Sequence, residues 1–197
     1  MDPHYNGKPS MISETTWTRP NRFRSEAPLY LAVYGALQDS DAIISSNGGL
    51  KLDYGKGVLT INAPQAQGVG GRLKLAGRVE TKELSIVSEM DLGHIVAVAL
   101  DDKPLALSGR ILLQVMSEEK ATGFATEPAG PGIKRILNIG RDPWLVRGLK
   151  GTVEFKRPDA ADLKVTALDF NGYPLRIIGN AQRIELRPTT VYYLISP

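Results

Sequence analysis

The sequence predicts a mainly β protein, an antiparallel two-sheet β-sandwich of jelly-roll-like form with one helix before it. Short β-type runs begin after about residue 45, and turn residues separate them at intervals of roughly ten residues, as in all-β sandwiches. The hydrophobic content of 42% is that of an ordinary globular protein. A chain of 197 residues has room for one large domain and a small additional piece. We therefore assign residues 1–44 to an N-terminal piece and residues 45–197 to the sandwich domain.

The N-terminal helix is expected over Asn21–Gln38. Leu29 and Val33 recur there at helical spacing, and Asn21 or Ser25 can cap the N-terminus. Pro28 fits the first turn if the cap is Ser25 or the residue before the proline, in which case the preceding residues form a loop.

The β-type runs supply about ten strands, enough to close a sandwich of two packed sheets. Period-two alternation is clean in several of them, and the Asn171-Gly172 pair has the chemistry of a tight turn. The glycine-rich stretch "GVGGRLKLAGR" lacks a complete G-x-G-x-x-G pattern, and we expect a bulged strand and a turn there with no helix after it. The predicted strands are Leu50–Tyr54, Val58–Asn62, Glu83–Val87, His94–Leu100, Arg110–Met116, Arg135–Ile139, Gly151–Phe155, Leu163–Leu168, Arg183–Arg187 and Val191–Ser196.

Composition argues against several classes of protein. Twenty-four Lys and Arg against 21 Asp and Glu give a formal net charge of +3 without a clustered basic arm, so we expect no nucleic-acid partner. No cysteine is present, which excludes disulfides and thiolate ligands. The chain shows no signal peptide and no run approaching the ~18 apolar residues of a membrane span, so no membrane partner is expected. The cell compartment stays open.

Neither a metal nor a cofactor is expected. The two histidines are isolated, which gives no transition-metal spacing. The acidic pairs Asp39/Asp41 and Asp101/Asp102 could ligate calcium, but neither has the spacing of a calcium-binding loop. Solvated turns are the favoured interpretation of both pairs.

Nucleophilic catalysis has only weak candidates. Ser117 and Lys120 match the S-x-x-K pattern, but that chemistry requires both side chains on one face at a helix start, whereas here they follow a predicted strand. A Ser-His-acid set could use only His4 or His94, and a turn histidine is the commoner interpretation of His94.

Two tryptophans are candidates for sugar binding, because the C–H face of a sugar stacks on an indole ring. Trp144 lies in "GRDPWLVRG" and Trp17 in "MISETTW". The competing interpretation of a lone tryptophan in a sandwich is a core residue.

Two segments together resemble a known family. "GKPSMISETTWTRPNRFRSEAPLYLAVYGALQDSDAI" looks like the seventh strand, loop and helix of a (β/α)8-barrel glycoside hydrolase of the bacterial agarase and β-galactosidase-like type. The β-rich remainder, with "VLTINAPQAQGVGG" and "VAVALDDKPLALSGRILLQVMS", is similar to the C-terminal β-sandwich of such enzymes. The resemblance implies that Glu14 is the nucleophile and that Trp17, Arg19 and Asn21 line the sugar site. A second carboxylic acid, about 5 Å away, would come from strand four.

About forty residues cannot hold the other strands of a barrel, so Glu14 has no acid partner within this chain. We therefore expect a truncated derivative of a glycoside hydrolase, an accessory sandwich with a structural or weak carbohydrate-binding role. One alternative is a small esterase whose site forms on oligomerisation from Ser13, Glu14 or Ser117 with a histidine. Another is an interaction module without catalysis. A homo-oligomer through the N-terminal segment is expected, because that segment's apolar stripe needs cover.

Overall fold

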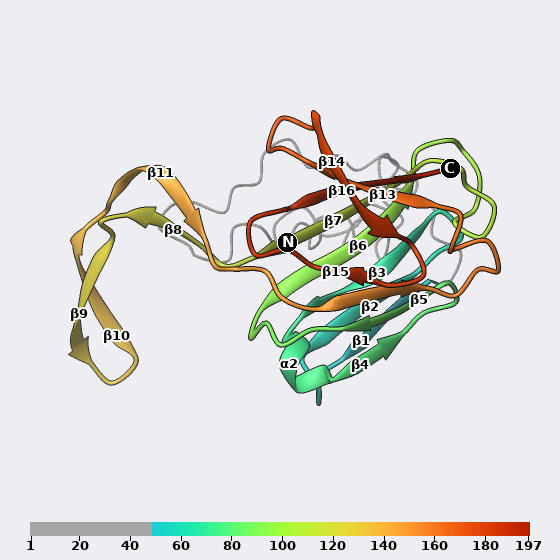
Figure 1. Ribbon diagram of the computed structural model, residues 1–197. Helices are drawn as coiled ribbons and strands as arrows, with labels where there is room; N and C mark the ends of the chain where they lie inside the picture. The colour runs from blue at the N-terminus through green and yellow to red at the C-terminus, as the bar shows by residue number, and fades with distance from the viewer. Residues whose placement is uncertain (1–48) are drawn as a thin grey trace, which may run out of the picture.

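The structure is a computed structural model in which residues 49–197 are described, and it confirms the mainly β fold with antiparallel sheets. Two sheets pack face to face as a sandwich, and a long pair of β-ribbons, residues 119–146, projects from it as an arm (Figure 1). The predicted helix and the whole predicted N-terminal piece, residues 1–44, lie outside the described residues.

The larger sheet contains eight strands, all in antiparallel pairs. In spatial order they are β1 (Leu50–Asp53), β2 (Val58–Asn62), β3 (Ala66–Gly71), β6 (Gly93–Ala99), β7 (Ile111–Ser117), β16 (Tyr192–Ser196), β13 (Lys164–Leu168) and β14 (Pro174–Asn180). The predicted Asn171-Gly172 turn joins β13 to β14, and Gly172 takes a φ of 86° there.

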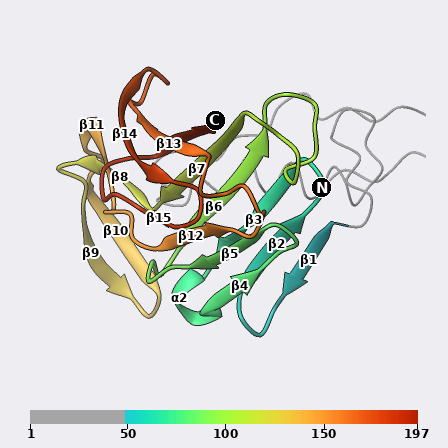
Figure 2. The same cartoon turned by 45° about the vertical axis from the view of Figure 1, so that its right-hand side comes forward.

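The smaller sheet lies in front of the larger one in Figure 2. Its four strands, in order, are β15 (Ile184–Glu185), β12 (Thr152–Phe155), β5 (Leu84–Val87) and β4 (Arg78–Glu80).

The core fills the space between the two sheets. Val69, Ile95 and Val115 lie in register across three neighbouring strands of the larger sheet and are fully buried. Ile86 and Val153 pair across the smaller sheet and belong to the same cluster. The alternation of apolar and polar residues that predicted these strands therefore arises because each sheet buries one face in a common core.

The glycine-rich stretch differs from the prediction. It forms the regular strand β3 without a register shift, and a single helical turn, α2 (Leu73–Ala76), follows it. Gly71 ends the strand at a φ of 122°, where an added Cβ would lie 2.3 Å from the carbonyl oxygen of Gly57. The expectation that no helix follows was thus wrong, since one helical turn is present. Gly71, with its positive φ, changes the direction of the chain directly after the strand, and Leu73 and Ala76 of the helical turn bury their side chains.

The arm was not predicted as such. It consists of two ribbons, one of β8 (Glu119–Thr122) with β11 (Arg141–Val146) and one of β9 (Ala125–Gly130) with β10 (Ile133–Asn138). Every residue of β10 is exposed, and Figure 1 shows the arm standing clear of the sandwich. Among residues 49–197, no helix is long and apolar enough to cross a membrane.

Candidate functional site

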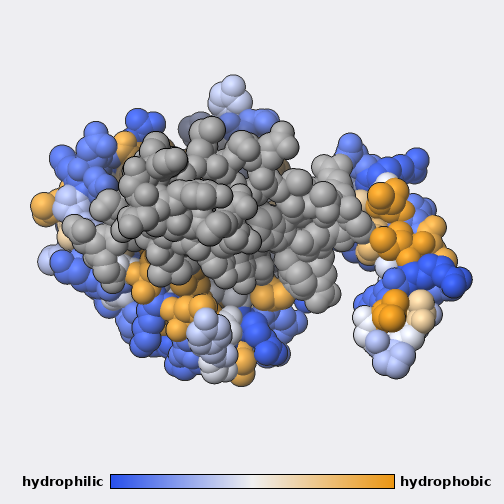
Figure 3. Space-filling view, turned by 180° about the vertical axis from the view of Figure 1, so that it is seen from behind, coloured by the Kyte–Doolittle hydropathy of each residue, from blue (hydrophilic) through white to orange (hydrophobic). Residues whose placement is uncertain are grey.

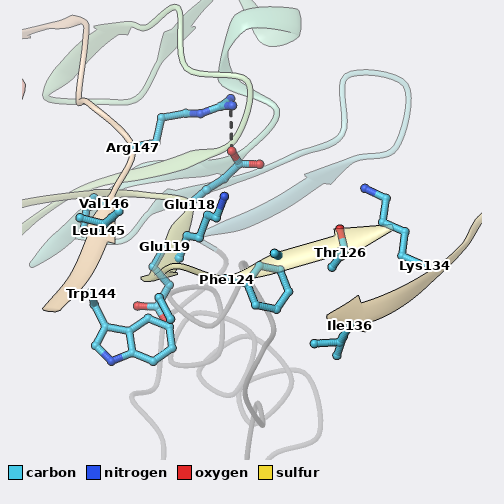
Figure 4. A pocket seen from close by; sticks show the side chains of 13 residues that line it. Glu118, Glu119, Phe124, Thr126, Lys134, Ile136, Trp144, Leu145, Val146 and Arg147 are labelled. Atoms are coloured by element: carbon cyan, nitrogen blue, oxygen red, sulfur yellow. Dashed lines mark ion pairs between the residues drawn. The ribbon is translucent and has the colours of Figure 1, made fainter. Parts of the chain in front are cut away.

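A large hollow lies along the inner part of the arm, and we call it the arm pocket. Its volume is about 910 Å³. The two ribbons and the turn between β8 and β9 contribute its walls (Figure 4). The lining residues are Glu118, Glu119, Lys120, Ala121, Phe124, Ala125, Thr126, Lys134, Ile136, Trp144, Leu145, Val146 and Arg147.

Trp144 is placed in this pocket by the pairing of β11 with β8. Trp144 lies opposite Ala121, and Val146 lies opposite Glu119, so the indole and the Glu119 carboxylate share one face of the ribbon as diagonal neighbours. Figure 4 shows the two side chains close to each other. The sequence predicted Trp144 as a sugar-binding candidate, with a core position as the competing interpretation, and the half-buried Trp144 is not part of the sandwich core.

Charged side chains line the pocket beside the aromatic ones. Arg147 lies 3.2 Å from Glu118 and 3.3 Å from Asp91, which fixes a small ion-pair cluster where the arm meets the sandwich. Figure 4 shows Phe124 between Glu119 on β8 and Lys134 on β10. The pocket thus combines two aromatic rings with carboxylate acceptors and ammonium donors, which is suited to a polar ligand with an apolar face.

The structure does not bring Ser117 and His94 together within one chain. Gly93 lies opposite Ser117 and His94 lies opposite Met116, so the Ser117 and His94 side chains point to opposite faces of the larger sheet. Ser117 is 2% exposed and its hydroxyl donates to the carbonyl of Arg147 at 2.5 Å. Lys120 lies in strand β8, so the S-x-x-K residues are not at a helix start.

His94 was predicted to open a strand after Gly93, where a turn histidine is the commoner interpretation, and it is the second residue of strand β6 and buried. Burial lowers the pKa of His94 to about 4. A neutral imidazole at physiological pH is therefore expected.

Asp101 acts within a loop of the sandwich, as expected for a turn aspartate. Its carboxylate accepts a hydrogen bond from the Ser108 hydroxyl at 2.6 Å and one from the Gly109 amide at 2.8 Å. These hydrogen bonds, of which the one from Ser108 has the larger effect, hold the pKa of Asp101 below its usual value. Its neighbour Asp102 takes a φ of 54° in the same loop. In the part of the chain that the structure describes, no three His, Asp or Glu side chains gather as a metal site would require.

The remaining predicted site residues lie outside the described residues, namely Glu14, Trp17, Arg19, Asn21, His4 and Ser13. Conversely, sequence reasoning did not single out Phe124 and Lys134, and it considered Glu119 only as part of the S-x-x-K match. Nothing in the sequence marked these three residues, because they line one pocket with Trp144 only through the folding of the arm.

Comparison of the chain with protein-family models, with curated proteins and with solved structures found no match in any of the three.

Proposed function

We propose that the β-sandwich is an accessory domain of glycoside-hydrolase type that binds a saccharide in the arm pocket and does not itself catalyse hydrolysis. The observation that carries this proposal is the position of the Trp144 indole in the pocket, on the same ribbon face as the carboxylate of Glu119. The apolar face of a sugar ring stacks on the indole, while its hydroxyls donate to Glu119 and accept from Lys134.

The size of the pocket agrees with an oligosaccharide ligand. Ligand pockets in proteins commonly measure about 300–1,000 Å³, and the arm pocket lies near the upper end of that range. The resemblance to agarase and β-galactosidase-like enzymes favours a galactan as the saccharide.

Affinity gel electrophoresis tests the proposal. The full chain is run through native gels containing agarose, a soluble galactan or a soluble β-glucan, beside Trp144→Ala and Phe170→Ala. Phe170 is the matched control, because it is an aromatic residue with 68% exposure that does not line the pocket. We expect at least one polysaccharide to retard the wild type and Phe170→Ala but not Trp144→Ala. Equal mobility of all three chains in every gel would refute the proposal.

A second measurement separates Trp144 from Trp17. The chain has two tryptophans, so Trp17→Phe leaves Trp144 as the single indole. Addition of the retarding saccharide should then change the tryptophan fluorescence with a saturable dependence. A change that disappears in Trp17→Phe would move the binding site to the N-terminal piece.

A second candidate function is an interaction module without catalysis. Five large apolar side chains of the arm are about half exposed or more, and apolar residues gather on the arm in Figure 3. They are Ile133, Ile136, Leu137, Ile139 and Leu145. Exposed apolar patches often mark protein contacts. If a second copy of this chain is the partner, light scattering should show a solution mass above the monomer that Leu137→Asp with Ile139→Asp lowers; a wild-type monomer would exclude that partner.

A further inference from the structure

The larger sheet has a second apolar face, directed away from the core. Residues directly opposite each other in antiparallel strands carry their side chains on the same face, so the register of the sheet sorts its residues into two sets. One set enters the core. The other defines what we call the outer apolar face, which contains Leu59, Ile61, Val96, Val98, Leu112 and Leu194.

These residues form continuous rows across the sheet. Ile61 and Val96 flank Gly68 in one row, and Val98, Leu112 and Leu194 are consecutive in the next. None of the six belongs to the buried core. The edge strand β1 extends the face with Leu52, which is 53% exposed.

A sheet face that contacts water is normally polar at alternate positions, whereas strands covered on both sides are apolar at successive positions. Strand β6 has the second pattern, as in His94-Ile95-Val96-Ala97-Val98, and β7 has it apart from the exposed Gln114. The smaller sheet covers only the core face. His94 on the outer side is nevertheless only 9% exposed, which also favours cover on this face.

We propose that the outer apolar face is the docking surface for residues 1–48 of the same chain. The chain enters the described structure at Gly49 and continues directly into β1, the edge strand of this sheet. The 48 residues before it therefore start beside the face. The inference does not depend on saccharide binding in the arm pocket.

The preceding segment has the length and the composition to cover the face. A helix over Asn21–Gln38 would be about 27 Å long. The strands from β1 to β16 are five spacings apart, or about 24 Å. The ten residues between this helix and Gly49 can span up to about 33 Å, so they reach any part of the face. Leu29, Val33 and Leu37 recur every four residues and would form one apolar stripe on such a helix.

Attachment to the same chain favours this occupant over a separate partner. A segment tethered by a short linker is present at an effective concentration in the millimolar range, far above that of a second copy in solution. Docking in cis also removes the apolar stripe from water without an exchange of segments.

Cysteine labelling of the full chain tests the inference, because the natural sequence contains no cysteine. Val96→Cys places a thiol on the outer apolar face, and Leu107→Cys places a control thiol at a site with 68% exposure. We expect a disulfide reagent to modify Val96→Cys at least about tenfold more slowly than the control, with equal rates in denaturant. Addition of Leu29→Asp and Val33→Asp should bring the Val96→Cys rate close to that of the control. Leu112→Cys replaces Val96→Cys if circular dichroism shows that the latter is unfolded.

Three outcomes would overturn the inference. In the first, Val96→Cys and Leu112→Cys react as fast as Leu107→Cys in the folded chain. In the second, both aspartate substitutions leave a slow rate unchanged, so that something other than this segment covers the face. In the third, the slow rate appears only at high protein concentration. That result would indicate cover by a second copy, as in the homo-oligomer expected from the sequence.

Discussion

The guanidinium of Arg157 donates through Nη1 to the carbonyl of Leu105 at 2.9 Å, and through the same nitrogen to the carbonyl of Ser108 at 2.7 Å. Its Nε and Nη2 donate to the two carboxylate oxygens of Asp159 at 2.6 and 2.7 Å. Arg157 is only 8% exposed. One buried side chain therefore joins the segment after β12 to the loop between β6 and β7.

Arg157→Ala should lower the free energy of unfolding by about 3 kcal/mol, because two carbonyls lose a charged donor inside the protein. Arg183→Ala is the matched control. Arg183 also contacts two carboxylates, those of Glu154 and Glu185, but its side chain is 59% exposed, so its loss should cost less than about 1 kcal/mol. Urea denaturation measures both values. Equal costs for the two variants would contradict the bridging role of Arg157.

Gln67→Leu should destabilise the sandwich by about 2 kcal/mol. Gln67 is 1% exposed, and its Oε1 accepts from the Thr81 hydroxyl at 2.7 Å and from the Glu83 amide at 2.8 Å. Leucine fills the same space but leaves the amide without an acceptor. The control Gln182→Leu changes an exposed glutamine of the turn before β15 and should have little effect. A Gln67→Leu variant as stable as wild type would show that water replaces the lost acceptor.

The sequence predicted strands correctly where buried and exposed residues alternate along the chain, as they do in a strand with one face in the core. All ten predicted β-type runs contain strands. In eight of them alternating residues, such as Ile111 and Leu113, enter one core, whereas the runs in the edge strand β1 and in the exposed strand β10 contribute no core residue. The arm follows a different rule. Its β9–β10 ribbon has water on both sides and contains Pro128 and Gly130, so no apolar alternation marks it. Only the run around Ile136 was predicted as a strand there.

The candidate site could be predicted only in part for the same reason. Trp144 was singled out by its residue type alone. Its meeting with Glu119, 25 positions earlier, depends on the pairing of β8 with β11, whose register shifts between Arg141 and Trp144 beside the cis peptide bond at Pro143. Local patterns carry no information about such a shift.

Ser117→Ala should leave any hydrolysis of nitrophenyl acetate by the chain unchanged. The Ser117 hydroxyl is buried in a hydrogen bond to Arg147, and His94 points to the other face of the sheet. The substitution should cost about 1 kcal/mol of stability, since the Arg147 carbonyl loses its donor. Steady-state rates of the two folded chains are compared at pH 7. Loss of turnover in Ser117→Ala would contradict this expectation and support the esterase hypothesis.

The stability of the protein should fall on the acid side of neutrality because of His94. Burial lowers the pKa of His94 to about 4 from an ordinary value of 6.5, so the unfolded chain binds a proton in a pH range where the folded chain does not. The contribution of a neutral His94 is complete above pH 6.5 and is lost as the pH falls toward 4. The difference of 2.5 pKa units corresponds to about 3 kcal/mol.

Comparison with His94→Leu isolates this contribution. Asp91 precedes β6 and Glu118 follows β7, and both form ion pairs with Arg147 that the variant retains. Urea unfolding of both chains between pH 7 and pH 4 should give a difference in free energy that grows in favour of His94→Leu as the pH falls. Parallel curves over this range would mean that His94 accepts a proton in the folded chain as readily as in the unfolded one.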